Sequence, residues 1–264
     1  RRPKMQENLI FRSMLNKTLR DFLSENGFIE IETPMLTRST PEGARDYLVP
    51  SRVNPGCFYA LPQSPQLFKQ ILMVAGMERY YQIVRCFRDE DLRADRQPEF
   101  TQLDMEMSFV DVDDVISLNE QLIKYVVEKT TGREVEIPFM RLTYKEAMEK
   151  YGSDKPDLRF GLEMVDVSEI ALKSDFKVFK DAVEKGGCVK SINIKRGGSI
   201  FSRRQIDDLV EKSKEFGAKG LAWISISSEG AKSTITKFFD DNTLNELTIK
   251  MQAEVDDLLV FVAD

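Results

Sequence analysis

Residues 102–109 alternate strictly between polar and apolar side chains, and this pattern narrows the folds open to the chain. Successive side chains of a β-strand point to opposite faces of a sheet, so one face here is apolar and the other polar. The apolar set is Leu103, Met105, Met107 and Phe109, and the polar set is Gln102, Asp104, Glu106 and Ser108. The stretch RYYQIVRCF at 79–87 is also strand-like, which predicts an antiparallel hairpin joined by a charged loop. We expect the second strand to be central in its sheet and its polar row to line a cavity.

Composition limits the chemistry that the chain can perform. Of its 264 residues, 42% are hydrophobic and 31% are charged, which is typical of a globular protein. The absence of histidine excludes histidine bases, histidine-dependent triads and histidine metal sites within this chain. The three cysteines lack CxxC spacing, and no apolar run is long enough to cross a bilayer. We expect a cytoplasmic protein without a membrane-spanning segment, and no metal site in this chain.

The order of the expected elements indicates an α+β fold in two domains. Apolar residues form a helical stripe over 8–26, and Ser64 followed by Pro65 predicts the start of a second helix. TYKE at 143–146 and SRRQ at 202–205 each predict a helix that begins with a capping box. From about residue 160 the units become shorter. We expect a domain at 1–158 and a smaller α+β domain at 159–264, joined by a stretch rich in Gly, Pro and Asp.

The loop between the two predicted strands carries both signs of charge at high density. In RCFRDEDLRADRQPEF, at 85–100, nine of the sixteen residues are charged. Arg88 stands at a strand end, where its rigid guanidinium suits a phosphate or carboxylate, and Phe100 begins the return strand, where a ring could stack on a base. A solvated loop held by its own salt bridges fits the same pattern. The residues alone leave both interpretations open.

Several stretches resemble one enzyme family, and they occur in the same order. GFIEIETPML at 27–36 resembles motif 1 of the class II aminoacyl-tRNA synthetases, and FRDEDLRADRQPEF at 87–100 resembles motif 2. Within that class, three stretches resemble the sequences of the bacterial aspartyl-tRNA synthetases: STPEGARDYLVPSR at 39–52, ALPQSPQLFKQ at 60–70 and YGSDKPDLR at 151–159. The resemblance implies part of an antiparallel-sheet catalytic core at 1–158. At 159–264 it implies a smaller α+β insertion domain that is shared with an amidotransferase subunit.

The resemblance implies an aspartate–tRNA ligase, which uses ATP to activate L-aspartate as aspartyl-adenylate and then transfers the aspartyl group to tRNA. Arg88 would be the catalytic residue, because it would bridge the α-phosphate and the carboxylate of the amino acid. The residues implied to bind aspartate are Glu42, Ser64, Gln66, Lys69, Arg88 and Asp104. Those implied to bind ATP, together with Mg²⁺, are Arg88, Asp89, Glu90, Gln97 and Phe100. Arg93 and Arg96 would contact the tRNA acceptor end, and Pro34 would lie at the interface of a homodimer.

Parts of the family pattern are missing from these residues. Within these 264 residues we find no stretch that resembles the family's anticodon-binding domain, and nothing after residue 110 resembles motif 3, which brings a second ATP-binding arginine in the family. We therefore expect this chain alone to be inactive in forming aspartyl-adenylate. Three alternatives stay open: an asparaginyl-tRNA synthetase, a relative of class II asparagine synthetase, and a non-catalytic module that binds tRNA or a partner. Lys69, Gln66 and Glu42 could also be ordinary exposed residues.

Overall fold

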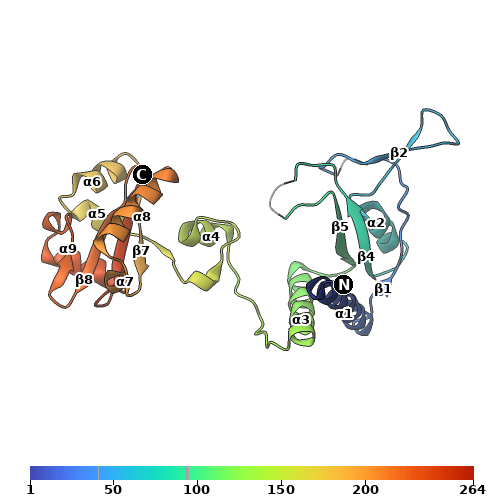
Figure 1. Cartoon of the computed structure of the whole chain (residues 1–264), viewed down its shortest axis with the longest axis horizontal. Helices are drawn as coiled ribbons and strands as arrows, with labels where there is room; N and C mark the ends of the chain where they lie inside the picture. Colours follow the sequence, from blue (N-terminus) through green and yellow to red (C-terminus); the bar gives the residue numbers. More distant parts are fainter. Residues whose placement is uncertain (41, 93–94) are drawn as a thin grey trace. The chain divides into compact units, whose positions relative to one another are not determined.

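The computed structural model describes residues 1–40, 42–92 and 95–264 (Figure 1). The chain divides into two compact units, Arg1–Met140 and Arg141–Asp264, each with its own sheets and helices. Mainly antiparallel sheets combined with helices confirm the predicted α+β class. Among the described residues no helix is both long enough and apolar enough to span a membrane.

A three-stranded sheet lies at the centre of the first unit. In spatial order its strands are β1 (Ile29–Glu30), β4 (Arg79–Phe87) and β5 (Glu99–Met107). β4 and β5 form the predicted antiparallel hairpin, in which Gln82 lies opposite Asp104 and Cys86 lies opposite Phe100. β1 runs parallel to β4. Within the described part of the chain β5 pairs with β4 alone, so the expectation that β5 is a central strand is wrong there.

Helices cover both faces of this sheet (Figure 1). The unit's remaining elements are α1 (Pro3–Glu25), β2 (Leu48–Pro50), β3 (Phe58–Ala60), α2 (Gln66–Val74) and α3 (Val112–Thr131). α1 packs against α3, and their apolar residues enclose a core with Leu103, Met105 and Met107 of β5. α2 contacts β4 and β5 from the polar face. Phe109 breaks the predicted row, because it lies beyond the strand with a φ of 58° and is 94% exposed.

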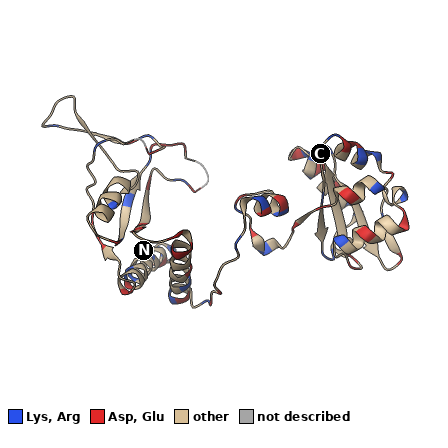
Figure 2. Cartoon of the chain, turned by 180° about the vertical axis from the view of Figure 1, so that it is seen from behind, with Lys and Arg blue, Asp and Glu red and all other residues tan. Residues whose placement is uncertain are grey.

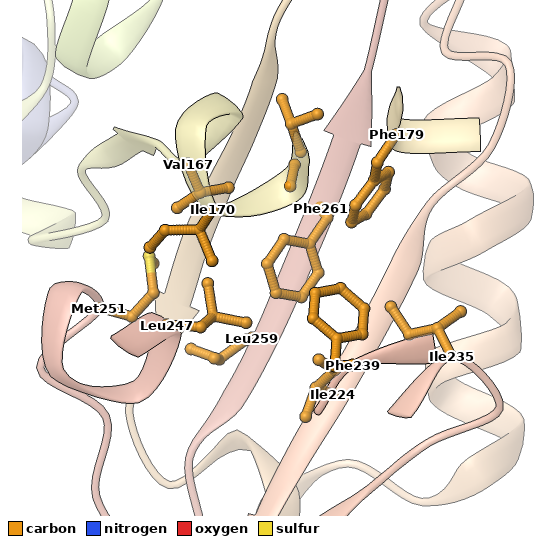
Figure 3. Packing of buried hydrophobic residues seen from close by; sticks show 12 residues of the cluster. Val167, Ile170, Phe179, Ile224, Ile235, Phe239, Leu247, Met251, Leu259 and Phe261 are labelled. Atoms are coloured by element: carbon orange, nitrogen blue, oxygen red, sulfur yellow. The ribbon is translucent and has the colours of Figure 1, made fainter. Parts of the chain in front are cut away.

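A five-stranded antiparallel sheet forms the second unit, in the order β6-β7-β10-β8-β9. These strands are β6 (Met164–Asp166), β7 (Val189–Ile194), β8 (Ala222–Ser227), β9 (Gly230–Lys232) and β10 (Leu258–Ala263). The helices are α4 (Tyr144–Tyr151), α5 (Ser168–Lys173), α6 (Lys177–Glu184), α7 (Gly197–Ile200), α8 (Arg203–Glu215) and α9 (Asp241–Lys250), with short 3-10 turns at Leu158–Phe160 and Thr236–Phe238. Because β10 is central, Leu259 and Phe261 are buried against Phe179, Phe239 and Leu247 (Figure 3).

Two of the predicted helix starts are confirmed in detail. The Thr143 hydroxyl accepts the backbone N–H of Glu146, whose carboxylate accepts the N–H of Thr143 in return. Ser202 and Gln205 form the same reciprocal cap on α8. Charged residues of both signs are interspersed along the helices of this unit, which is typical of a solvated surface (Figure 2).

The boundary between the units lies between Met140 and Arg141, not at the predicted position of 158/159. Helix α4 contacts β6, and the hydroxyl of Tyr151 donates to Glu163 at 2.8 Å. The stretch at 152–159 is therefore a turn within the second unit. Its Gly, Pro and Asp content indicated a loop correctly, but composition carries no information about the unit against which the preceding helix packs.

Candidate functional site

A half-buried lysine lies between two carboxylates on the polar face of β5. The Nζ atom of Lys69, on α2, is 3.0 Å from Oδ1 of Asp104 and 3.2 Å from Oε2 of Glu106. The Asp104 side chain is 2% exposed and that of Lys69 is 14% exposed. Burial acts to lower the pKa of Lys69, but Asp104 and Glu106 outweigh it and raise the pKa above its usual value. Lys69 is therefore a fixed positive charge, and Gln102 holds the other oxygen of Asp104 with a hydrogen bond of 2.6 Å.

The loop that contains Glu42 closes over the start of α2. The Ser64 hydroxyl donates to Oε2 of Glu42 at 2.9 Å, and the Thr40 hydroxyl donates to Oε1 at 3.2 Å. Ser64 does not cap α2 as predicted, since the helix begins at Gln66 with Pro65 at the cap position. A cavity of about 220 Å³ lies beside these contacts. Its lining residues come from the loop and from the β3–α2 connection: Thr37, Arg38, Thr40, Glu42, Asp46, Ala60, Leu61, Pro62, Gln63, Ser64, Leu67 and Phe68.

A second cavity, of about 250 Å³, lies at the charged end of the β4–β5 hairpin. It is lined by Arg88, Glu90, Asp95, Arg96, Gln97 and Phe100. The guanidinium carbon of Arg88 lies 4.9 Å from the centre of the Phe100 ring, within the range of a cation–π contact. Among the residues that the structure describes, Arg88 has no carboxylate within salt-bridge distance, whereas Arg96 donates to Glu90 at 2.8 Å. The cavity therefore presents one arginine that is not neutralised and an aromatic ring beneath it.

Both groups of residues lie on the same face of the hairpin. Phe100 and Asp104 are both even-numbered positions of β5, four residues apart, which corresponds to about 13 Å along a strand. Cys86 lies opposite Phe100 on this face, and its pKa is raised to about 11. Burial is the main cause, the carboxylate of Asp104 adds to it, and the guanidinium of Arg88 opposes it. Lys69 and Arg88 thus flank one polar face, and the Cys86 thiol between them stays protonated at neutral pH.

The remaining predicted residues have simpler surroundings. Gln66 begins α2, one turn before Lys69, but lines neither cavity. Asp89 lies beside the second cavity, where its N–H donates to the carbonyl of Arg45 at 2.9 Å. Pro34 is exposed on the surface of the first unit. Arg93, the other predicted tRNA contact, lies outside the described residues.

Two features of the site were missed from the sequence. Glu106 was placed on the polar face, but the alternation gave it no role beside Lys69. Gln63 was not considered, although its amide is 3% exposed and makes three hydrogen bonds to the Glu42 loop. Its position next to Ser64 was the only available signal. Across residues 1–40, 42–92 and 95–264, no group of three or more His, Cys, Asp or Glu side chains could hold a metal ion.

The structure thus places an arginine at the end of a strand, an aromatic ring beside it and a half-buried lysine on the same sheet face. Residues 1–263 match the family described as tRNA synthetases class II (D, K and N). The chain therefore belongs to this family, and the predicted membership is confirmed.

The similar proteins include bacterial enzymes named aspartate–tRNA(Asp/Asn) ligase. The one from Caldanaerobacter subterraneus subsp. tengcongensis is 60% identical over 264 residues, covering 100% of this chain and 44% of the relative. The one from Symbiobacterium thermophilum is 63% identical over 265 residues, with the same coverage of 100% and 44%. The chain thus spans less than half the length of the curated relatives that it matches.

Two solved structures are similar to parts of this chain. A protein described as an aspartyl-tRNA synthetase from Leishmania major Friedlin is 26% identical with a TM-score of 0.41, covering 47% of this chain and 23% of that one. An Entamoeba histolytica asparaginyl-tRNA synthetase in complex with asparaginyl-adenylate is 23% identical with a TM-score of 0.47, covering 54% of this chain and 34% of that one.

Proposed function

We propose that this chain is part of an aspartate–tRNA ligase and carries its aspartate pocket and part of its ATP site. The class II family match and the relatives at about 60% identity support this proposal. The observation that carries it is the half-buried ammonium of Lys69, which is fixed by Asp104 on the same sheet face as Arg88.

Lys69 suits recognition of an acidic side chain. An ammonium carries three N–H donors, and Lys69 faces two carboxylates, so a donor remains for a carboxylate of the substrate. A cationic side chain has no acceptor to offer this remaining donor, whereas a carboxylate of the substrate does. Asp104 would act by holding Lys69 in place, while Glu42, Ser64 and Gln66 would contact the rest of the amino acid.

Arg88 suits the reacting phosphate. In the first step a carboxylate oxygen of aspartate attacks the α-phosphorus of ATP, the bond to the bridging oxygen breaks, and pyrophosphate leaves. Two anions must approach each other, so a guanidinium without a carboxylate partner stabilises the charge that develops. Phe100 would stack under the adenine, and Asp89, Glu90 and Gln97 would lie beside the bound ATP. Mg²⁺ bound to the triphosphate would supply further positive charge.

The second step, transfer to tRNA, and the homodimer are proposed from the family resemblance. A ribose hydroxyl of tRNA attacks the carbonyl carbon of aspartyl-adenylate, and AMP leaves with the negative charge. Arg96, together with Arg93, would meet the acceptor end of tRNA, and that contact should weaken with added salt. Exposed Pro34 suits a homodimer interface. Because tRNA and ATP are its substrates, the enzyme would work in the cytoplasm.

The test is ATP–pyrophosphate exchange on the full-length protein that contains this chain, with aspartate and asparagine compared. Lys69→Met should lower kcat/KM for aspartate by about 10- to 100-fold, since a hydrogen bond to a charged group contributes roughly 1.5–3 kcal/mol. Lys145→Met is the matched control, because Lys145 is 81% exposed and its pair with Glu149 spans 3.8 Å. It should leave the exchange unchanged.

The rival functions give different results. Exchange that depends on asparagine in place of aspartate would show an asparagine-activating relative. No exchange with either amino acid, combined with retained tRNA binding, would show a non-catalytic module. An unchanged kcat/KM in Lys69→Met would refute the proposed role of the lysine.

A further inference from the structure

Gln63 holds the Glu42 loop with every polar atom of its amide. Its Oε1 accepts the N–H of Ala44 at 3.1 Å, and its Nε2 donates to the carbonyl of Ala44 at 2.8 Å and to Oδ1 of Asp46 at 2.6 Å. The residue is 3% exposed. A buried amide that satisfies both backbone groups of one residue fixes that residue's position, because breaking either bond leaves a buried polar group unpaired.

The clamped segment, residues 44–46, also reaches the nucleotide end of the hairpin. Between Ala44 and Asp46, the carbonyl of Arg45 accepts the N–H of Asp89 at 2.9 Å in an isolated β-bridge. Asp89 directly follows Arg88. A second connection runs beside it, since the N–H of Phe87 donates to the carbonyl of residue 62 at 3.0 Å.

The same segment is tied to the amino acid end. Glu42 lies two residues before Ala44 and accepts the hydroxyl of Ser64, the residue next to Gln63. The contacts form a closed ring through Ser64, Gln63, Ala44 and Glu42, and the ring is joined through the clamped segment to the strand end that carries Arg88. A displacement of Glu42 or Ser64 would therefore be transmitted to the backbone beside Arg88.

We propose that Gln63 is a positioning residue that couples the aspartate pocket to the ATP pocket, so that each substrate strengthens the binding of the other. The inference rests on the proposed function. Aspartate bound beside Glu42 and Ser64 would add contacts to this ring, and residues 44–46 would transmit the added restraint to the backbone beside Arg88. ATP then binds to a strand end that is already ordered. Such coupling is reciprocal, so ATP also strengthens the binding of aspartate.

The experiment measures the dissociation constant of a non-hydrolysable ATP analogue with and without aspartate, on the full-length protein that contains this chain. In the wild type aspartate should strengthen binding of the analogue by about 5-fold or more, the lower end of ordinary coupling. In Gln63→Leu this ratio should fall to about 1, and the KM for aspartate should rise about 10-fold. Affinity for the analogue alone should change less than about 2-fold, since Gln63 does not line that cavity. Gln70→Leu, at an exposed position of α2, is the matched control and should keep the wild-type ratio.

Hydrogen exchange supplies a readout at the clamp itself. The N–H of Ala44 should exchange faster in Gln63→Leu and stay protected in Gln70→Leu, with protection of β4 and β5 unchanged in both. If Gln63→Leu fails to fold, Asp46→Leu removes one clamp bond at a half-buried site and should lower the same ratio. Asp46→Asn keeps an acceptor for Gln63 and should restore it.

The failures are distinguishable. A wild type without aspartate-dependent exchange of pyrophosphate refutes the proposed function. An active wild type whose ratio is about 1, or whose ratio survives Gln63→Leu or Asp46→Leu, refutes the coupling. A lower kcat with fewer active sites and an unchanged KM would show that Gln63 is only structural, and this too overturns the inference.

Discussion

Asp257 is the side chain whose loss we expect to destabilise the second unit most clearly. It precedes β10, and its side chain is 2% exposed. Its Oδ1 accepts the N–H of Arg196 at 2.8 Å, and its Oδ2 accepts the N–H of Glu254 at 2.9 Å and the side chain of Asn193 at 3.1 Å. The Lys195 ammonium adds a contact of 3.0 Å. One carboxylate thus joins the end of β7 to the loop that leads into the central strand.

Asp257→Ala should lower the free energy of unfolding by about 3 kcal/mol. It leaves the N–H groups of Arg196 and Glu254 without their acceptor. A fully buried unpaired group costs roughly 1–3 kcal/mol, and because these two bonds are part-buried the sum lies in the lower half of the range for two groups. Lys195 contributes little to this total, because it is 54% exposed and water screens its charge.

The pH dependence has a definite sign. Burial acts to raise the pKa of Asp257, but the N–H groups of Glu254 and Arg196 outweigh it and lower the pKa to about 2, from 3.8. The carboxylate therefore stabilises the fold above about pH 4, and this stabilisation is lost as the pH falls towards 2. The difference corresponds to about 2 kcal/mol, which Asp257→Asn should lack.

Urea unfolding followed by fluorescence measures both effects. Trp223 is the single tryptophan of the chain and lies on β8, opposite Val260 of β10, so it reports on this sheet. The midpoint should fall by about 1–3 M in Asp257→Ala, given slopes of roughly 1–3 kcal/mol/M. Asp208→Asn, at an exposed position of α8, is the control and should not shift it. A midpoint for Asp257→Ala within 0.2 M of the control, taken as about the resolution of such a titration, would refute the reasoning.

Two further predictions concern close packing and the nucleotide. Gly197→Ala should lower the free energy of unfolding by about 1–3 kcal/mol, because a Cβ there would lie 2.7 Å from that of Leu258, whereas Gly220→Ala, with no atom within 4 Å, should be neutral in the same urea assay. Phe100→Leu removes the ring beneath Arg88 and should raise the KM for ATP about 10-fold in pyrophosphate exchange. An equal rise in the KM for aspartate would contradict a role confined to the nucleotide.

Local sequence rules predicted helix starts well where only neighbouring residues take part. The caps at Thr143 and Ser202 formed as expected, because each needs an acid or amide three residues later and nothing else. The same rule failed at Ser64, whose hydroxyl bonds to Glu42, 22 residues earlier in the chain. A partner so distant in sequence competes with the helix for the same side chain, and no local pattern shows it.

Long-range contacts explain what the sequence could not predict. The polar face of β5 followed from alternation, but its ion pair with Lys69 was expected only through the family resemblance. Asp257 gave no signal at all, because the residue that it fixes, Arg196, is 61 positions away. A residue such as Asp257 acquires its partners where loops distant in sequence come together in the fold, and neither composition nor a local sequence pattern predicts those contacts.

Strand β5 serves the core and the site at the same time. Leu103 and Met105 pack beneath α1 and α3, while Asp104 and Phe100 point to the polar face. Because side chains alternate with a period of two, the register that buries the first pair also fixes the second. A slip of one residue against β4 would bury the carboxylate of Asp104 in the apolar core and leave Lys69 against an aliphatic side chain, and both changes are costly. Core packing on the far side of the strand therefore sets the spacing between Lys69 and the cavity beside Arg88, so residues that line neither group determine the geometry of the candidate site.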